Sequence, residues 1–304
     1  GLMDYIQKAN KQKIRTGSDQ VAVIYAQGEI LFGEGGKDYI GQGIIVNALQ
    51  KAVDNKSVKA IVLRVDSPGG SALVSDIIWR EIQLAKKEKP LVVSFGNVAA
   101  SGGYYIGVAG DKIFADPTTI TGSIGVFGTI PNVHEFADNI GVNAEQVGTN
   151  KNSVDYSFFE PMTDSFRNAM QESIKETYQT FLDRVSKGRN MTVEQVNEIA
   201  QGRVWSGVDA KALGLVDELG DLDDAIAAAA EMADLDSYGI RKYPKYKSGF
   251  EKFMENYGSV KTKIGESFIK EEIGSEAYDI LKEFKQFTKQ EGVQAKMPFR
   301  LNIK

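Results

Sequence analysis

The stretch that decides the fold runs from Pro90 to Tyr105 and reads PLVVSFGNVAASGGYY. Its first part, Leu91–Phe95, is short, apolar and β-branched at its centre, which predicts a buried strand. Its second part, Ala99–Gly103, consists of small residues that let the backbone approach another segment or a ligand closely. Ser101 lies in this turn without a bulky neighbour, a position suited to a nucleophile. The alternative is an ordinary helix N-cap, a common role of serine before a helix.

The segment before this stretch has the same order of elements. A continuous apolar run at Lys59–Val65 predicts a strand buried on both faces, and a helix is expected over Ala72–Lys86. Between them lies the glycine turn Asp66–Ser71, with the sequence DSPGGS. Alternating strands, glycine turns and helices predict an α/β fold whose turns meet at the carboxyl edge of the sheet. Two such turns can direct backbone N–H groups at one oxygen, as an oxyanion hole requires.

The remaining periodicity predicts further elements on both sides. We expect strands at 20–26, 28–32 and 112–115, and helices at 44–55, 163–187 and 222–233. A second run of small residues, Thr121–Gly125, contains Ser123, and hydroxyl groups in this run can hydrogen-bond near the first site. The alternative is that these small residues only let packed elements approach one another.

Composition excludes several kinds of chemistry. The chain of 304 residues has no cysteine, which excludes disulfides, thiol nucleophiles and thiolate metal sites. His134 is the single histidine, so clustered-histidine metal sites are excluded as well, and we expect His134 to be a surface or structural residue. The net charge of -5 gives no indication of nucleic-acid binding. A serine hydrolase built from this chain therefore needs a base other than histidine.

Four motifs in order and at matching spacing resemble the signal peptide peptidase A family of serine proteases. They are DSPGG at 66–70, AASGGY at 99–104, TGSIG at 121–125 and GRVWSG at 202–207. The resemblance covers residues 21–232 and implies the Clp protease/crotonase-like fold, built of repeated strand-strand-helix units. It also implies a Ser-Lys dyad that cleaves remnant signal peptides beside small or apolar residues, at the extracytoplasmic (periplasmic) face of the cell membrane. A homo-oligomer and the absence of any metal or organic cofactor are implied too.

The same resemblance implies roles for individual residues. Ser101 corresponds to the nucleophile, and the backbone N–H groups of Gly69 or Gly70 and of Gly102 correspond to the oxyanion hole. Ser123 matches a serine that hydrogen-bonds the catalytic lysine in relatives. A lysine amine can accept the serine proton when burial lowers its pKa, so this chemistry needs neither histidine nor cysteine.

The catalytic lysine is where the chain departs from the family pattern. In short relatives it falls in the stretch corresponding to Val147–Val154, but here Ser153 occupies the matching position and Lys151 lies close by. Either Lys151 is the base, or the base belongs to residues outside this chain. Long relatives contain two tandem halves, with the lysine in the N-terminal half and the serine in the C-terminal half. We favour the second interpretation, in which this chain resembles the C-terminal half.

The expected domain organisation has three parts. Residues 1–19 are polar and predict a linker or exposed arm, and residues 20–235 form the catalytic domain. Residues 236–304 form a C-terminal extension with helical apolar spacing, suited to packing against the protein or to lying on a membrane. Two other functional hypotheses remain open: a crotonase-like acyl-CoA enzyme and a catalytically silent scaffold.

Overall fold

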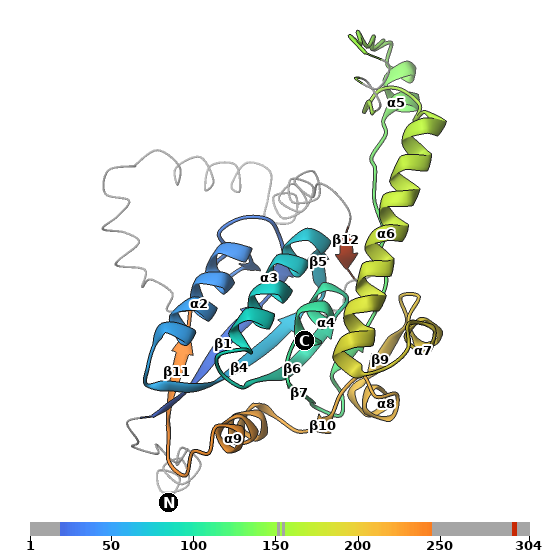
Figure 1. Ribbon diagram of the computed structural model, residues 1–304. Coiled ribbons are helices and arrows are strands. Elements are labelled where there is room, and N and C mark those ends of the chain that lie inside the picture. The colour runs from blue at the N-terminus through green and yellow to red at the C-terminus, as the bar shows by residue number, and fades with distance from the viewer. Residues whose placement is uncertain (1–18, 151–152, 154–155, 245–293, 297–304) are drawn as a thin grey trace, which may run out of the picture.

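The computed structural model describes residues 19–150, 153, 156–244 and 294–296 (Figure 1). These residues form two sheets with helices on both faces of the larger one. The helix expected in the C-terminal extension lies outside the described residues. Within that extension the described residues form two short strands, at Gly239–Tyr243 and Gln294–Lys296. No helix in the described ranges is long and apolar enough to cross a lipid bilayer.

The larger sheet has the strand order β10-β7-β6-β4-β1-β11, and β8 joins it between β6 and β9. All of its pairs are parallel except β8 with β9. Its strands are β1 (Gln20–Gln27), β4 (Val58–Ser67), β6 (Leu91–Ala100), β7 (Lys112–Ala115), β8 (Ile120–Gly122), β9 (Val204–Ser206), β10 (Glu218–Leu219) and β11 (Gly239–Tyr243). The predicted division of the chain at residue 235 stays a prediction, but β11 extends the sheet beyond it.

A smaller sheet has the order β12-β5-β2-β3. Its strands are β2 (Glu29–Ile30), β3 (Tyr39–Ile40), β5 (Gly69–Ser71) and β12 (Gln294–Lys296). A long strand of the larger sheet is followed twice by short strands of the smaller sheet and then by a helix, as β1-β2-β3-α2 and as β4-β5-α3. This order confirms the expected fold of repeated strand-strand-helix units.

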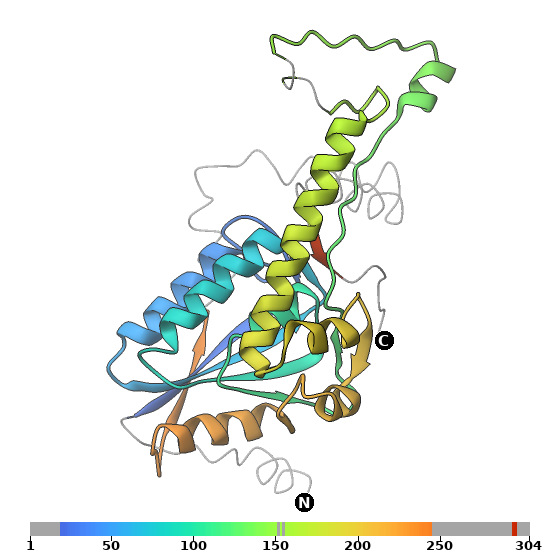
Figure 2. The same ribbon diagram turned by 45° about the vertical axis from the view of Figure 1, so that its right-hand side comes forward.

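Helices cover the two faces of the larger sheet because its strands are apolar on both sides. On one face, α2 (Gln42–Asp54), α3 (Ala72–Ala85) and α4 (Gly102–Gly107) pack on residues such as Ile24 and Leu63. On the other face, α9 (Leu222–Met232) packs on alternate residues such as Val23 and Val62. Figure 2 shows α9 on the side of the sheet opposite α3.

An arm projects from this body (Figures 1 and 2). We define the arm as the described residues of 128–175, which include α5 (His134–Asn139) and the first part of α6 (Asp164–Arg189). The buried residues of α6, Phe181, Leu182 and Val185, all lie in its second half. The second half of α6 therefore anchors the arm to the body, followed by α7 (Val193–Ile199) and α8 (Gly207–Ala212).

Candidate active site

Ser101 lies between the end of β6 and the first turn of α4, as the sequence predicts. Its side chain makes no capping hydrogen bond to the helix, which argues against the N-cap interpretation. The residue is 0% exposed, and its Oγ is the one buried side-chain polar atom of the described residues without a hydrogen-bond partner. A buried hydroxyl without a hydrogen-bond partner lowers the stability of a protein by about 1–3 kcal/mol. Its presence at this position therefore indicates a functional role.

The backbone of Ser101 is strained, with φ 53° and ψ -116°. A non-glycine residue with positive φ persists only where its surroundings hold it in place. Two hydrogen bonds do so here: the Ser101 N–H donates to the Gly122 carbonyl oxygen at 2.8 Å, and the Tyr105 N–H donates to the Ser101 carbonyl oxygen at 2.8 Å. The hydroxyl is thus fixed at the carboxyl edge of the larger sheet.

The glycine turn at the end of β4 lies against this serine. A Cβ added at Gly103 would be 2.6 Å from the Ser67 carbonyl oxygen, so the first turn of α4 packs directly on the turn. Gly69 and Gly70 have φ values of 97° and 152°, which favour glycine. The Gly69 N–H donates to Ser67 Oγ at 3.1 Å, a contact that the sequence did not reveal. A bound oxyanion would therefore compete with Ser67 for the Gly69 donor.

The other two motifs converge on the same place. β8 pairs with the end of β6, and the Thr121 hydroxyl donates to the Ala99 carbonyl oxygen at 2.6 Å. Ser123 is buried, has φ 49°, and its N–H donates to the Arg203 carbonyl oxygen at 2.7 Å. The antiparallel pairing of β8 with β9 thus joins the GRVWSG motif to the site. The fold brings the predicted segments around Ser101, Ser123, Gly69, Gly70 and Gly102 to one edge.

The predicted lysine position is on the arm. Lys151 lies outside the described residues, whereas Asn150 and Ser153 are exposed, and the Ser153 hydroxyl donates to the Asn150 carbonyl oxygen at 2.9 Å. In the described part of the chain, no lysine is a hydrogen-bond partner of Ser101 Oγ.

His134 begins α5 on the arm, with Nδ1 2.8 Å from the Phe159 carbonyl oxygen and Nε2 3.5 Å from Asp138. These contacts agree with the expected surface or structural role of His134, and among the described residues His134 is not a hydrogen-bond partner of Ser101 Oγ.

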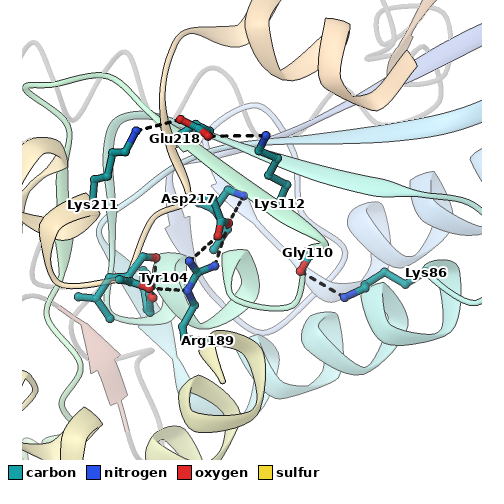
Figure 3. A network of polar contacts seen from close by, with 11 residues as sticks. Lys86, Tyr104, Gly110, Lys112, Arg189, Lys211, Asp217 and Glu218 are labelled. Atoms are coloured by element: carbon teal, nitrogen blue, oxygen red, sulfur yellow. Dashed lines mark hydrogen bonds and ion pairs between the residues drawn. The ribbon is translucent and has the colours of Figure 1, made fainter. Parts of the chain in front are cut away.

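Tyr104 and Tyr105, which follow Ser101 in α4, are both hydrogen-bonded to residues far away in the chain, and no sequence pattern indicated these partners. The Tyr104 hydroxyl donates to the Leu215 carbonyl oxygen at 2.9 Å, next to the ion pair between Arg189 and Asp217 (Figure 3). Arg189 donates to both carboxylate oxygens of Asp217, at 2.7 and 2.9 Å. Burial opposes ionisation of Asp217, but the hydrogen bonds from Arg189 outweigh it and hold the Asp217 pKa below its ordinary value.

Tyr105 is held by a second ion pair, between Asp76 and Arg184. Its hydroxyl donates to Asp76 Oδ1 at 2.6 Å, and Arg184 of α6 reaches the same oxygen at 3.2 Å. Burial, and then the hydrogen bond to Asp76, raise the Tyr105 pKa well above its ordinary value. The helix that follows the nucleophile is therefore fixed to both α3 and α6.

A depression of about 360 Å³ opens elsewhere, at the β7–β10 edge of the larger sheet. Its lining includes Lys112 and Glu218, and Glu218 also accepts a 2.8 Å hydrogen bond from Lys211 (Figure 3). Ser101 is not part of this lining. Among the residues that the structure describes, no three His, Cys, Asp or Glu side chains form a group that could hold a metal ion.

Comparison with known proteins shows which family this chain matches. The model of the family described as Peptidase family S49 matches residues 83–236. Protease 4 of Salmonella typhi is 42% identical over 249 residues, which are 81% of this chain and 40% of the relative. The chloroplastic serine protease SPPA of Arabidopsis thaliana is 39% identical over 224 residues, which are 72% of this chain and 33% of the relative. The chain thus spans well under half the length of these two relatives.

One solved structure, of a ClpP1 variant from Listeria monocytogenes, aligns with 67% of this chain and 94% of its own. The TM-score is 0.45 and the sequence identity is 16%.

Proposed function

The chain belongs to peptidase family S49, a family of serine proteases, and we propose that it carries the nucleophile of an endopeptidase that degrades cleaved signal peptides. One observation carries the proposal: Ser101 has a buried Oγ without a hydrogen-bond partner and a strained backbone with positive φ. It lies where the four sequence motifs come together. Ordinary structural serines are hydrogen-bonded when buried, as Ser75 is to the Ser71 carbonyl oxygen at 2.9 Å.

In the proposed reaction, Ser101 Oγ attacks the carbonyl carbon of the scissile peptide bond while a neutral lysine amine accepts the hydroxyl proton. The backbone N–H groups of Gly70, or of Gly69 after it releases Ser67, and of Gly102 stabilise the oxyanion of the tetrahedral intermediate. The lysine then donates its proton to the leaving amine, which leaves an ester on Ser101. Water, deprotonated by the same lysine, hydrolyses that ester. Ser123 orients the lysine by a hydrogen bond.

The lysine of this reaction comes from outside the chain described here. Ser101 Oγ has no lysine partner among the described residues, and the segment that flanks Lys151 is exposed on the arm, which projects away from the body that contains Ser101. The greater length of Protease 4 and of SPPA is consistent with a further half that supplies the base.

Subunits assemble into a homo-oligomer through the arm. The arm exposes large apolar side chains, among them Phe136 at 65%. Three aromatic rings form one continuous cluster there, with centroids 6.2 Å apart for Tyr156 and Phe158 and 5.6 Å apart for Tyr156 and Phe166. Exposed apolar surface of this kind is typical of sites where proteins associate. The assembly acts at the extracytoplasmic side of a membrane, where signal peptides remain after export.

Labelling by a fluorophosphonate probe, which reacts with activated serines, tests the proposal. We expect the longest natural version of the protein to be labelled, the label to be lost in Ser101→Ala, and the label to persist in Lys151→Ala. Loss of labelling in Lys151→Ala would place the base in this chain. Absence of labelling from every version would refute the proposed activity.

A further inference from the structure

The strand that leads into Ser101, β6, lies between β4 and β7 in the larger sheet (Figure 1). Its pairing with β4 is interrupted near its end, because Val65 lies opposite Phe95 whereas Ser67 lies opposite Ala99. Three residues of β6, at 96–98, therefore face a single residue of β4. We call residues 96–98 the β6 bulge. Bulges are frequent next to active sites, where they redirect a side chain.

The β6 bulge determines how far the nucleophile extends beyond β4. With uninterrupted pairing, Ser67 would lie opposite Asn97, and Ser101 would follow four residues later. With the bulge, Ser101 follows two residues after the partner of Ser67. Two residues of extended strand span about 6–7 Å. Because side chains alternate between the faces of a sheet, two extra residues leave the facing unchanged, and Phe95 and Ala99 belong to the same core cluster. The bulge therefore brings Ser101 closer to the glycine turn on the same face.

The residue opposite the bulge, Asp66, supplies a hydrogen-bond acceptor to it. A bulge disrupts the ladder of main-chain hydrogen bonds. Here the Val98 N–H donates to Asp66 Oδ1 at 3.1 Å, so a side chain takes the place of a main-chain partner. A Cβ added at Gly96 would lie 2.9 Å from Asp66 Cγ, which shows how closely the bulge packs on this carboxyl group. From the other side, the Thr119 hydroxyl donates to the Gly96 carbonyl oxygen at 2.7 Å.

Asp66 is itself fixed where the two halves of the proposed site meet. Its carbonyl oxygen accepts a 3.0 Å hydrogen bond from the Gly28 N–H, at the junction of β1 and β2. Asp66 comes three residues before Gly69, a proposed oxyanion donor, and Val98 comes three residues before Ser101. The contact between Asp66 and Val98 therefore joins the oxyanion turn to the strand of the nucleophile, close to both groups that act on one carbonyl.

We propose that Asp66 is a positioning residue, which holds the β6 bulge and thereby sets the position of Ser101 relative to the oxyanion donors. The inference rests on the proposed function for the identity of the nucleophile. The role requires a hydrogen-bond acceptor at the position of Oδ1 and requires no charge. A displacement of about 1 Å in an active site can lower a rate about a hundredfold, so loss of this acceptor slows the acylation of Ser101.

The rate of labelling by a fluorophosphonate probe tests this role in the longest natural version of the protein. Asp66→Ala removes the acceptor, and we expect the second-order rate constant to fall at least about tenfold. Asp66→Asn keeps an acceptor oxygen at the same place, so its rate constant should stay within about threefold of that of the unmodified protein. Asp66→Glu keeps the charge but moves the carboxyl group by one methylene, and should be slowed at least about tenfold.

Asp111→Ala is the matched control. Asp111 Oδ2 accepts a 2.8 Å hydrogen bond from the Leu91 N–H at the other end of β6, so the variant removes the same kind of contact far from Ser101. Its labelling rate constant should change by less than about twofold. Equal slowing in Asp111→Ala and Asp66→Ala would overturn the inference, because any loosening of β6 would then be enough. Slow labelling of Asp66→Asn together with fast labelling of Asp66→Glu would also overturn it, because the charge would then be what matters.

Hydrogen exchange measured by mass spectrometry tests the bulge without any reaction. We expect the amides of residues 96–101 to exchange about tenfold faster in Asp66→Ala than in Asp66→Asn, and those of residues 91–95 to exchange equally in both. Equal exchange of residues 96–101 in the two variants would overturn the inference. Absence of labelling from every version, together with faster exchange in Asp66→Ala, would refute the proposed activity and keep the role of Asp66 in holding the bulge. Labelling at the same rate in all versions would keep the activity and refute the positioning role.

Discussion

The backbone N–H of Ser101 donates a 2.8 Å hydrogen bond to the carbonyl oxygen of Gly122. This bond joins the residue after β6 to the last residue of β8, and it holds the strained backbone of the nucleophile in place. The site is therefore assembled by main-chain contacts between segments of small residues. Side chains further away, such as those of Tyr104 and Tyr105, hold the helix that follows.

Replacement of Ser101 is expected to raise the stability of the protein. Ser101→Ala removes a buried hydroxyl that has no partner, and Ser101→Gly also relieves the positive φ. We expect the free energy of unfolding to rise by about 1 kcal/mol for alanine and by about 2 kcal/mol for glycine. Urea denaturation measures the free energy of unfolding of each variant.

Ser75→Ala is the matched control for this prediction, because Ser75 is equally buried but donates a hydrogen bond to the Ser71 carbonyl oxygen. It should lower the stability by about 1 kcal/mol. If Ser101→Ala were as destabilising as Ser75→Ala, Ser101 Oγ would have a partner in solution.

Gly70 is expected to tolerate no side chain. A Cβ at this position would lie 2.0 Å from the Ile30 carbonyl oxygen, and the φ of 152° is unfavourable for other residues. Gly70→Ala should therefore destabilise the protein by about 3 kcal/mol, since β2 has to move away from β5. Gly36→Ala is the control, because a Cβ there meets nothing within 4 Å, and the change should stay within about 0.5 kcal/mol. Thermal unfolding of the two variants measures these two changes in stability.

The ion pair between Arg189 and Asp217 is expected to stabilise the body of the protein. Breaking a buried pair costs about 3–5 kcal/mol, but the Asp217 side chain is 32% exposed, so solvent screening reduces our expectation for Arg189→Ala to about 2 kcal/mol. Lys187→Ala, which removes a charge from an exposed position of the same helix, should change the stability by less than about 0.5 kcal/mol.

The same pair predicts a pH dependence. The pKa of Asp217 in the folded protein lies below its ordinary value of 3.8, so this group contributes stability above that pH. The contribution disappears as the pH falls through the lower pKa of the folded state. The stability difference between the unmodified protein and Arg189→Ala should therefore be constant near neutral pH and narrow below pH 3.8. A difference that does not depend on pH would show that packing of Arg189 accounts for it.

The arm is expected to mediate self-association. Phe136→Asp places a charge on an exposed apolar position of α5 and should raise the dissociation constant of the oligomer at least about tenfold. Met232→Asp, at a 45% exposed position at the end of α9, is the control and should leave association unchanged. Light scattering over a dilution series measures both. Equal effects of the two variants would exclude the arm as the interface.

Much of the fold and of the site could be predicted because the relevant signals are local. The apolar run that begins at Leu91 and the small residues around Ser101 predict a strand, a turn and a nucleophile position within one short stretch. The strand is longer than expected, since Gly96 lets it pass the Asp66 side chain, and the Val98 N–H donates to Asp66 Oδ1 at 3.1 Å. That contact depends on a neighbouring strand, which periodicity does not reveal.

Other features depend on residues far apart in the chain. Arg189 and Asp217 are individually ordinary charged residues, and their pairing beside Tyr104 follows only from the folded arrangement. The periodicity of the sequence predicts a helix at 163–187, but it does not show that the buried residues of α6 all lie in its second half. No sequence signal marks where this helix leaves the body, because that point depends on the helices and strands it packs against.

The pairing of β11 with β1 also bears on how the protein is made. Gln20 lies opposite Gly239, so the first long strand of the sheet has its outer neighbour more than 200 residues later in the chain. During synthesis one edge of β1 therefore stays unpaired until residue 243 has left the ribosome. Unpaired strand edges tend to pair with other chains. A fragment that stops near residue 236, where the family match ends, would keep that edge open permanently. The shortest piece expected to fold without aggregating extends through Tyr243.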